Sequence, residues 1–145
     1  MRQAFTLIEL IFVIVIIGLL AAVAVPKFIN LKQHTVANSV VKTTLDAAQQ
    51  AVEAASNRYN LDNNNSFTLK DLINLTGKGW TAPNDYEYDY NDSVSHKLVA
   101  SIVLDTTNKE INYSINCTDL NDTQAQKYCE HLINGRQTIQ ESLPY

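Results

Sequence analysis

The sequence predicts an α+β protein in which one long N-terminal helix packs on a small antiparallel β-sheet head. Three observations favour this class. Strong hydrophobes are concentrated in the first 31 residues, a helical apolar stripe follows, and short alternating segments occur in the polar remainder. We expect four parts, namely a short N-terminal segment at 1–4, a transmembrane helix half at 5–25, an amphipathic helix half at 26–58 and a globular head at 59–145.

The N-terminal segment is long and apolar enough to cross a bilayer. No charged residue lies between Leu10 and Val25, and only Thr6 and Glu9 interrupt the run back to Phe5. At the helical rise per residue this run spans roughly 30 Å, which matches the hydrocarbon core of a membrane.

Two simpler interpretations of this segment compete. The run Ala22-Val23-Ala24 resembles a signal-peptide cleavage site, but Glu9 stands where a positive region belongs and Arg2 is the only basic side chain there. A plain membrane anchor explains the length but gives Glu9 no function. A carboxylate in hydrocarbon is unfavourable unless it is paired or protonated, and the segment contains no cation to pair with it.

The stretch from Ala4 to Leu10, followed by the apolar run, resembles the processing motif of type IV pilins and type II secretion pseudopilins. The resemblance implies that a prepilin peptidase cuts between Ala4 and Phe5 and that Phe5 is then N-methylated. Glu9 matches the acid at the family's fifth mature position. The family usually has Gly before the cut, where this chain has Ala4, the nearest small substitute.

Cleavage would create a positive amine on Phe5, which is the cation that Glu9 lacks. A neighbouring subunit shifted along the filament axis could place its Phe5 amine against this Glu9, so that neither charge stays unpaired in a low-dielectric core. Our hypothesis is that this pairing sets the register of incoming subunits.

Pro26 and Gly18 match the proline and glycine that recur in the helices of this family. Proline removes a backbone hydrogen bond, so we expect a kink or local melting of the helix near Ala22. The alternative is that Pro26 ends the span. The resemblance favours a helix that continues through it.

Beyond Pro26 the pattern becomes amphipathic. The apolar stripe consists of Ala37, Val41, Leu45, Ala48, Val52, Ala55 and Tyr59, and the other sides carry Lys42, Thr44, Asp46, Gln49, Gln50 and Glu53. We expect the helix to run to about Arg58 and to be broken by residues 62–66. The stripe would pack on the sheet, as the resemblance implies, with a coiled coil as the alternative.

The head should begin with a short helix at 66–76, capped by Thr68 with Asp71 and stopped by Gly77. Strands are expected at 86–90, 98–104 and 110–116, with a turn at 106–109 and a further helix at 122–133. The alternating tyrosines of the first strand indicate a half-buried sheet face.

Cys117 and Cys129 are expected to form a disulfide, because an exported head lies in an oxidising compartment. The resemblance supports this pairing, since many pilins link their C-terminal region in this way. Two buried thiols are the alternative, and the spacing does not fit a CxxC redox site.

Composition argues against several other functions. The net charge of −4 gives no attraction to nucleic acid, and no nucleophile motif, phosphate loop, zinc spacing or catalytic carboxylate pair occurs, so we expect neither an enzyme nor a cofactor. Acids and amides at 84–92 and 105–110 could bind calcium, although solvated loops are the alternative. His34, His96 and His131 are isolated and expected to face solvent. Several Asn-x-Ser/Thr sequons occur, including those at Asn91, Asn112 and Asn121, each with an acid two residues earlier, which resembles the bacterial N-glycosylation acceptor.

The resemblance therefore implies a structural subunit that waits in the inner membrane with its head in the periplasm. It would then join a periplasmic or cell-surface filament of identical and related minor subunits. Its other partners would be the prepilin peptidase and an inner-membrane platform protein. A type IV pilus is the first expectation, with a type II secretion pseudopilus or a DNA-uptake filament as alternatives. A membrane-anchored extracytoplasmic binding module is the alternative from a different class.

Overall fold

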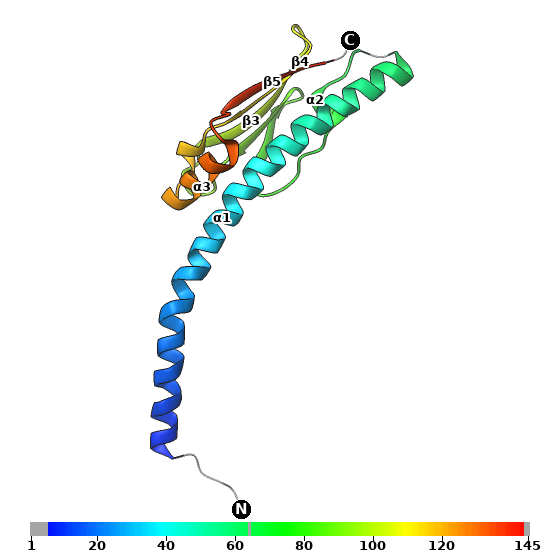
Figure 1. Cartoon of the computed structure of the whole chain (residues 1–145). Helices are drawn as coiled ribbons and strands as arrows, with labels where there is room; N and C mark the ends of the chain where they lie inside the picture. The colour runs from blue at the N-terminus through cyan, green and yellow to red at the C-terminus, as the bar shows by residue number, and fades with distance from the viewer. Residues whose placement is uncertain (1–5, 64, 144–145) are drawn as a thin grey trace, which may run out of the picture.

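The computed structural model describes residues 6–63 and 65–143. A long helix, α1 (Leu7–Asp62), carries the head on its C-terminal half, while its N-terminal half stands clear of the head (Figure 1). The head contains a five-stranded antiparallel sheet in the order β1-β2-β3-β4-β5, which confirms the α+β layout. Its strands are β1 (Trp80–Asn84), β2 (Glu87–Asn91), β3 (Leu98–Asp105), β4 (Glu110–Ile115) and β5 (Thr138–Ser142). The remaining helices are α2 (Leu69–Leu72), the 3-10 helix η1 (Cys117–Asp119) and α3 (Thr123–Ile133).

Helix α1 runs without a break through Pro26 and reaches Asp62, beyond the expected end at Arg58. The interpretation that Pro26 ends the span is therefore wrong, and the helix does not melt near Ala22. Figure 1 shows a gradual curve along the helix. The helix ends where Asn63 adopts a left-handed conformation with φ of 47°, which fits the predicted break at 62–66.

The buried face of α1 consists of small side chains, and its position was predicted only in part. Thr44, expected on the polar side, is fully buried, whereas Leu45 is 38% exposed. The hydroxyl of Thr44 donates to the carbonyl oxygen of Val40 at 2.8 Å, so its burial leaves no unpaired donor. The complete buried set is Ala37, Val40, Val41, Thr44, Ala47, Ala48, Ala51 and Ala55. These small residues let the sheet approach the helix closely.

The three central strands were predicted and the two edge strands were not. β1 contains Pro83 and β5 presents only Ile139 as a strong hydrophobe, so neither segment shows the alternation of a central strand. On the inner face Tyr88 is buried and its hydroxyl donates to the carbonyl oxygen of Ile73 at 3.2 Å. Tyr86 lies in the β1–β2 turn and is exposed, so the predicted tyrosine face applies only to the other two tyrosines of the segment.

Helix α2 is much shorter than the expected 66–76. The capping box of Thr68 and Asp71 is present as predicted, but the helix ends at Ile73 rather than at Gly77. Ile73 has an extended backbone and a buried side chain, and its carbonyl oxygen accepts the Tyr88 hydroxyl. This tertiary packing ends the helix before the glycine is reached.

Gly79 lies where a side chain does not fit, so we expect Gly79→Ala to destabilise the head. Its φ is +94°, and an added Cβ would lie 2.5 Å from Cε2 of Tyr90 and 3.0 Å from the carbonyl oxygen of Asn91. We expect a loss of about 2 kcal/mol in the free energy of unfolding, measured by chemical denaturation of the detergent-solubilised chain. Gly77→Ala is the matched control, because its φ is also positive but its Cβ would meet nothing within 4 Å. Equal losses in the two variants would contradict the steric argument.

Asp89 on β2 is expected to make the fold less stable at neutral pH. Burial raises the pKa of Asp89, and the neighbouring Glu87 raises it further. Its Oδ1 is buried and has no hydrogen-bond partner among the described residues. A raised pKa in the folded state means that the penalty develops as pH rises above the ordinary pKa of an Asp and is complete above the folded pKa. Asp89→Asn should therefore raise the melting temperature at pH 7. This gain should vanish as the pH falls below the ordinary pKa of an Asp side chain.

Asp92 provides a control, because its substitution by Asn is expected to change the melting temperature in the opposite direction. Burial alone would raise its pKa, but hydrogen bonds from the amides of Ser95 and Val94 outweigh this and lower the pKa of Asp92 overall. Its stabilising contribution is present above the ordinary pKa of an Asp and is lost as pH falls through the lower folded pKa. Asp92→Asn should thus lower the melting temperature at pH 7. A loss of stability in Asp89→Asn as well would contradict the assignment of Asp89.

Candidate processing and assembly site

Glu9 closes the N-terminal end of α1 through a reciprocal capping box with Thr6. Its Oε2 accepts from the backbone amide of Thr6 at 2.9 Å and from the Thr6 hydroxyl at 2.7 Å, while the amide of Glu9 donates to that hydroxyl at 3.3 Å. The carboxylate therefore has neutral donors in its own chain, which sequence reasoning missed although Thr-x-x-Glu is a recognisable capping signature. These contacts do not neutralise its charge.

The predicted cleavage position, between Ala4 and Phe5, lies outside the described residues, as does the proposed methylation site on Phe5. The described part of the site therefore consists of Thr6, Glu9 and the apolar helix that follows them.

The N-terminal half of α1 has an almost entirely exposed apolar surface. Large side chains from Leu7, which is 76% exposed, to Leu31 have no packing partner within the described chain. This helix is the one in the described residues that is long and apolar enough to cross a membrane, by length and composition. At Gly18 an added Cβ would meet nothing within 4 Å, so the space beside it is open to another molecule.

Comparison with known proteins supports the interpretation of the N-terminal segment as a processing motif. Residues 1–25 match the model of the prokaryotic N-terminal methylation motif, which is the signature of type IV pilins and pseudopilins. No curated protein and no solved structure matches the chain. The class that the motif and the fold support is a pilin-like or pseudopilin subunit, a structural protein rather than an enzyme.

The motif also has consequences for the maturation of the chain. It implies processing by prepilin peptidase and assembly into a filament. Together with the apolar helix it fits a membrane-anchored precursor that ends in that filament.

The predicted disulfide between Cys117 and Cys129 is confirmed. It joins η1 to α3 with a Cα–Cα distance of 5.6 Å, and both residues are buried in a cluster that includes Ala37, Val40 and Val41 of α1. The disulfide therefore fixes the C-terminal part of the head against the long helix.

The three histidines are exposed, as expected, but the expectation that they are isolated is wrong for two of them. The ring of His34 on α1 stacks on Tyr128 of α3 with centroids 4.2 Å apart, and His131 lies parallel to the same tyrosine at 6.5 Å. Sequence reasoning could not find this stack, because its residues come from two helices nearly a hundred positions apart. The stack holds α3 to α1 where the long helix leaves the head.

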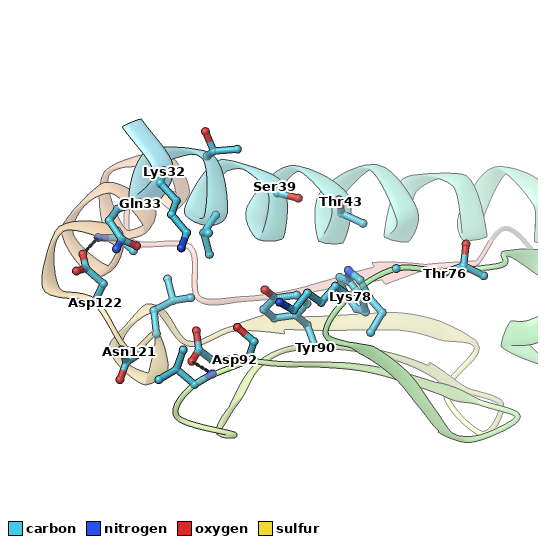
Figure 2. A pocket seen from close by; sticks show the side chains of 18 residues that line it. Lys32, Gln33, Ser39, Thr43, Thr76, Lys78, Tyr90, Asp92, Asn121 and Asp122 are labelled. Carbon is cyan, nitrogen blue, oxygen red and sulfur yellow. Dashed lines mark hydrogen bonds between the residues drawn. The ribbon is translucent and has the colours of Figure 1, made fainter. Parts of the chain in front are cut away.

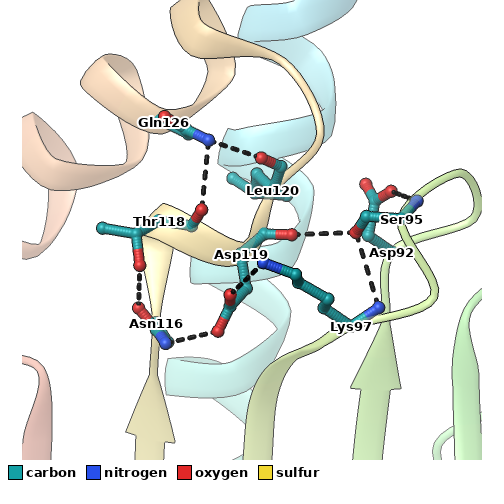
Figure 3. Close-up of polar contacts among 8 residues, drawn as sticks. All are labelled: Asp92, Ser95, Lys97, Asn116, Thr118, Asp119, Leu120 and Gln126. Carbon is teal, nitrogen blue, oxygen red and sulfur yellow. Dashed lines mark hydrogen bonds and ion pairs between the residues drawn. The ribbon is translucent and has the colours of Figure 1, made fainter.

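A polar network joins the β2–β3 loop to the disulfide region (Figure 3). The carboxylate of Asp119 pairs with the ammonium of Lys97 at 3.3 Å and accepts from the side-chain amide of Asn116. The hydroxyl of Ser95 donates to the carbonyl oxygen of Asp119 at 3.0 Å. The side-chain amide of Gln126 in α3 donates to the carbonyl oxygens of Thr118 and Leu120. The η1 segment is therefore bound both to the β2–β3 loop and to α3.

A cleft of about 470 Å³ with mixed polar and apolar walls lies between α1 and the loops at the same end of the head (Figure 2). Lys32 of α1, Lys78 and Tyr90 contribute to its walls. The carboxylate of Asp92 also reaches it but already accepts from the amides of Val94 and Ser95 at 2.9 and 2.7 Å.

Two carboxylates in the acidic segments considered for calcium, those of Asp85 and Asp105, make contacts with the protein. Asp105 accepts from the amides of Thr107 and Asn108 at 2.9 Å, and Asp85 pairs with Lys70 at 2.8 Å. Across residues 6–63 and 65–143, no group of three His, Cys, Asp or Glu side chains is placed to hold a metal ion.

Proposed function

We propose that this chain is a structural subunit of a type IV pilus or pilus-like filament, assembled from the inner membrane with the head in the periplasm. The observation that carries this proposal is the methylation motif at residues 1–25, which continues directly into an exposed apolar helix bearing Glu9. A helix of this kind, with no packing partner in its own chain, requires either lipid or other copies around it.

Pairing between Glu9 and the Phe5 amine of a neighbouring subunit would organise the assembly. The freed amine of the same chain lies one residue before Thr6, whose amide already contacts the Glu9 carboxylate. The Phe5 amine of the same chain would therefore compete with the Phe5 amine of a neighbouring subunit for the Glu9 carboxylate. Side-by-side packing of helices would bring a neighbour's Phe5 amine to this Glu9, so that neither charge stays unpaired inside the apolar bundle.

The proposed partners follow from the methylation motif and the family that it resembles. Prepilin peptidase removes residues 1–4, identical and minor subunits surround the apolar half of α1, and an inner-membrane platform protein adds subunits to the base of the filament.

The decisive experiment is an intact-mass measurement of the chain extracted from membranes of its native host. We expect the mass to lack residues 1–4 and to carry one additional methyl group on Phe5. Ala4→Gly, which restores the residue usual in the family, should be processed at least as completely, whereas Ala4→Leu should stay unprocessed. A chain that retains Met1, or one that begins at Pro26, would contradict the proposal.

Deletion of the gene that encodes this chain would identify the type of filament. We expect surface fibres to be lost. Intact fibres with a defect in protein export, or in DNA uptake, would assign the subunit to a secretion pseudopilus or to a DNA-uptake filament.

A further inference from the structure

We propose that Asn121 is an acceptor for N-linked glycosylation, receiving an oligosaccharide from a lipid-linked pyrophosphate donor. The inference rests on the export of the head that the proposed function requires. Its basis is the Asn-x-Ser/Thr pattern with an acid two residues before the asparagine. Asn64, Asn91, Asn112 and Asn121 satisfy this pattern, whereas Asn74 and Asn116 have the hydroxyl residue but no preceding acid.

The transfer is a balanced substitution at carbon. A bond forms between the side-chain nitrogen of Asn121 and C1 of the first sugar, and the bond between C1 and the pyrophosphate oxygen breaks. The amide proton passes to a base of the transferase, and the lipid pyrophosphate leaves. No oxidant or reductant is required.

Asn112 is excluded by its place in the sheet. It lies in β4, where it is paired with Val103 on one side and Gln140 on the other, and its Oδ1 is buried. The hydroxyl that completes its pattern, on Ser114, is hydrogen-bonded to the Ser101 hydroxyl at 3.0 Å. A transferase would have to remove a central strand to reach this asparagine.

Asn91 is also held by the sheet. It is the last residue of β2, is paired with Leu98, and its backbone amide donates to the carbonyl oxygen of Gly79 at 2.9 Å. Its side chain is half-buried, and the next residue, Asp92, is only 7% exposed. A transferase that must surround the acceptor segment therefore has poor access to it.

Unlike Asn91 and Asn112, Asn121 is exposed and lies outside the sheet. It lies on the turn between η1 and α3, at the edge of the cleft and close to Asp92 (Figure 2). Thr123, which completes the pattern, is the exposed first residue of α3. Within the described chain neither side chain makes a hydrogen bond, and the one backbone contact of Asn121, from its amide to the Asp92 carboxylate, lies outside the sheet and α3. Both residues can therefore enter a transferase site without loss of secondary structure.

The preceding acid is available after a small rearrangement. Asp119 pairs with Lys97 and also accepts from the side-chain amide of Asn116. The Lys97 and Asp119 side chains are 63% and 25% exposed, so the ion pair is partly solvated and weak. Lys97→Gln should therefore increase glycosylation of Asn121 if this ion pair competes with the transferase for Asp119. Asn64 lies outside the described residues, so the experiment must test it directly.

The test uses the full-length chain in cells that supply a membrane N-oligosaccharyltransferase and a lipid-linked oligosaccharide. Intact mass and glycopeptide sequencing should show one added oligosaccharide on Asn121. This added mass should be lost in Asn121→Gln and in Thr123→Val but retained in Thr123→Ser, which keeps the hydroxyl. Asn112→Gln and Asn64→Gln should leave the glycan on Asn121 in place.

The same mass spectrum separates this inference from the proposed function, because leader removal changes the N-terminus and glycosylation changes the peptide around Asn121. A processed N-terminus with an unmodified Asn121 would overturn only the glycosylation. Absence of added mass, or added mass confined to other asparagines, overturns it whatever the N-terminus shows.

Discussion

Replacing Glu9 with Ala is expected to reduce filament yield by more than about a hundredfold while the head stays folded. Removing one member of a buried ion pair costs about 3–5 kcal/mol, and each 1.4 kcal/mol is a factor of about ten in an equilibrium constant. Sheared filaments, quantified by immunoblot against total subunit, measure the loss. The head should be unaffected, because Glu9 lies in the first turn of α1 and the described hydrogen bonds of its carboxylate are to Thr6 alone.

Glu9→Gln separates the charge from the helix cap. The glutamine side chain retains an oxygen that can accept from the Thr6 amide, but it carries no charge to pair with the Phe5 amine. If the ion pair matters, filament yield should fall in Glu9→Gln nearly as far as in Glu9→Ala. Normal assembly of Glu9→Gln would assign the effect to the capping box, and normal assembly of Glu9→Ala would defeat the pairing hypothesis altogether.

Removing the disulfide is the second change with a large expected effect. Cys117 and Cys129 are 12 residues apart, and closing a loop of this size stabilises a fold by roughly 3 kcal/mol in the chain-entropy model. The double variant Cys117→Ala with Cys129→Ala should lose about this much, measured as the shift in denaturation of the detergent-solubilised chain. Because both sulfurs are buried against α1, the loss should be accompanied by faster proteolysis around α3.

A reductant provides the control for this variant. Reduction of the wild-type chain should reproduce the loss of stability, and it should have no further effect on the double alanine variant. If the variant and the reduced wild type both retained wild-type stability, the disulfide would not be what fixes α3 to the helix.

The site and the fold differ in how far the sequence predicts them. Glu9 stands out because an acid in an apolar run is unfavourable, and Cys117 and Cys129 stand out because of the exported context. The Thr6 cap carried the same kind of signal as the cap at Thr68, which was recognised. The Thr6 cap was therefore predictable from the sequence, because Thr-x-x-Glu is as clear a capping signature as Thr-x-x-Asp.

Within the head, local pattern located the central strands and α3 but not the features fixed by tertiary contacts. Thr44 is buried and Leu45 exposed because the distance between helix and sheet, and not hydrophobicity alone, determines which side chain fits. Ile73 ends α2 because its carbonyl meets Tyr88. The stack of His34 on Tyr128 joins distant segments, which no local pattern reports.

The bare N-terminal half of α1 has a thermodynamic consequence for how such subunits come together. Its apolar side chains leave water when the precursor inserts into lipid, so later contact with other helices exchanges one dry environment for another. The hydrophobic effect then contributes little to polymerisation. Close van der Waals fit between helices and neutralisation of charge would then have to supply the driving force for assembly.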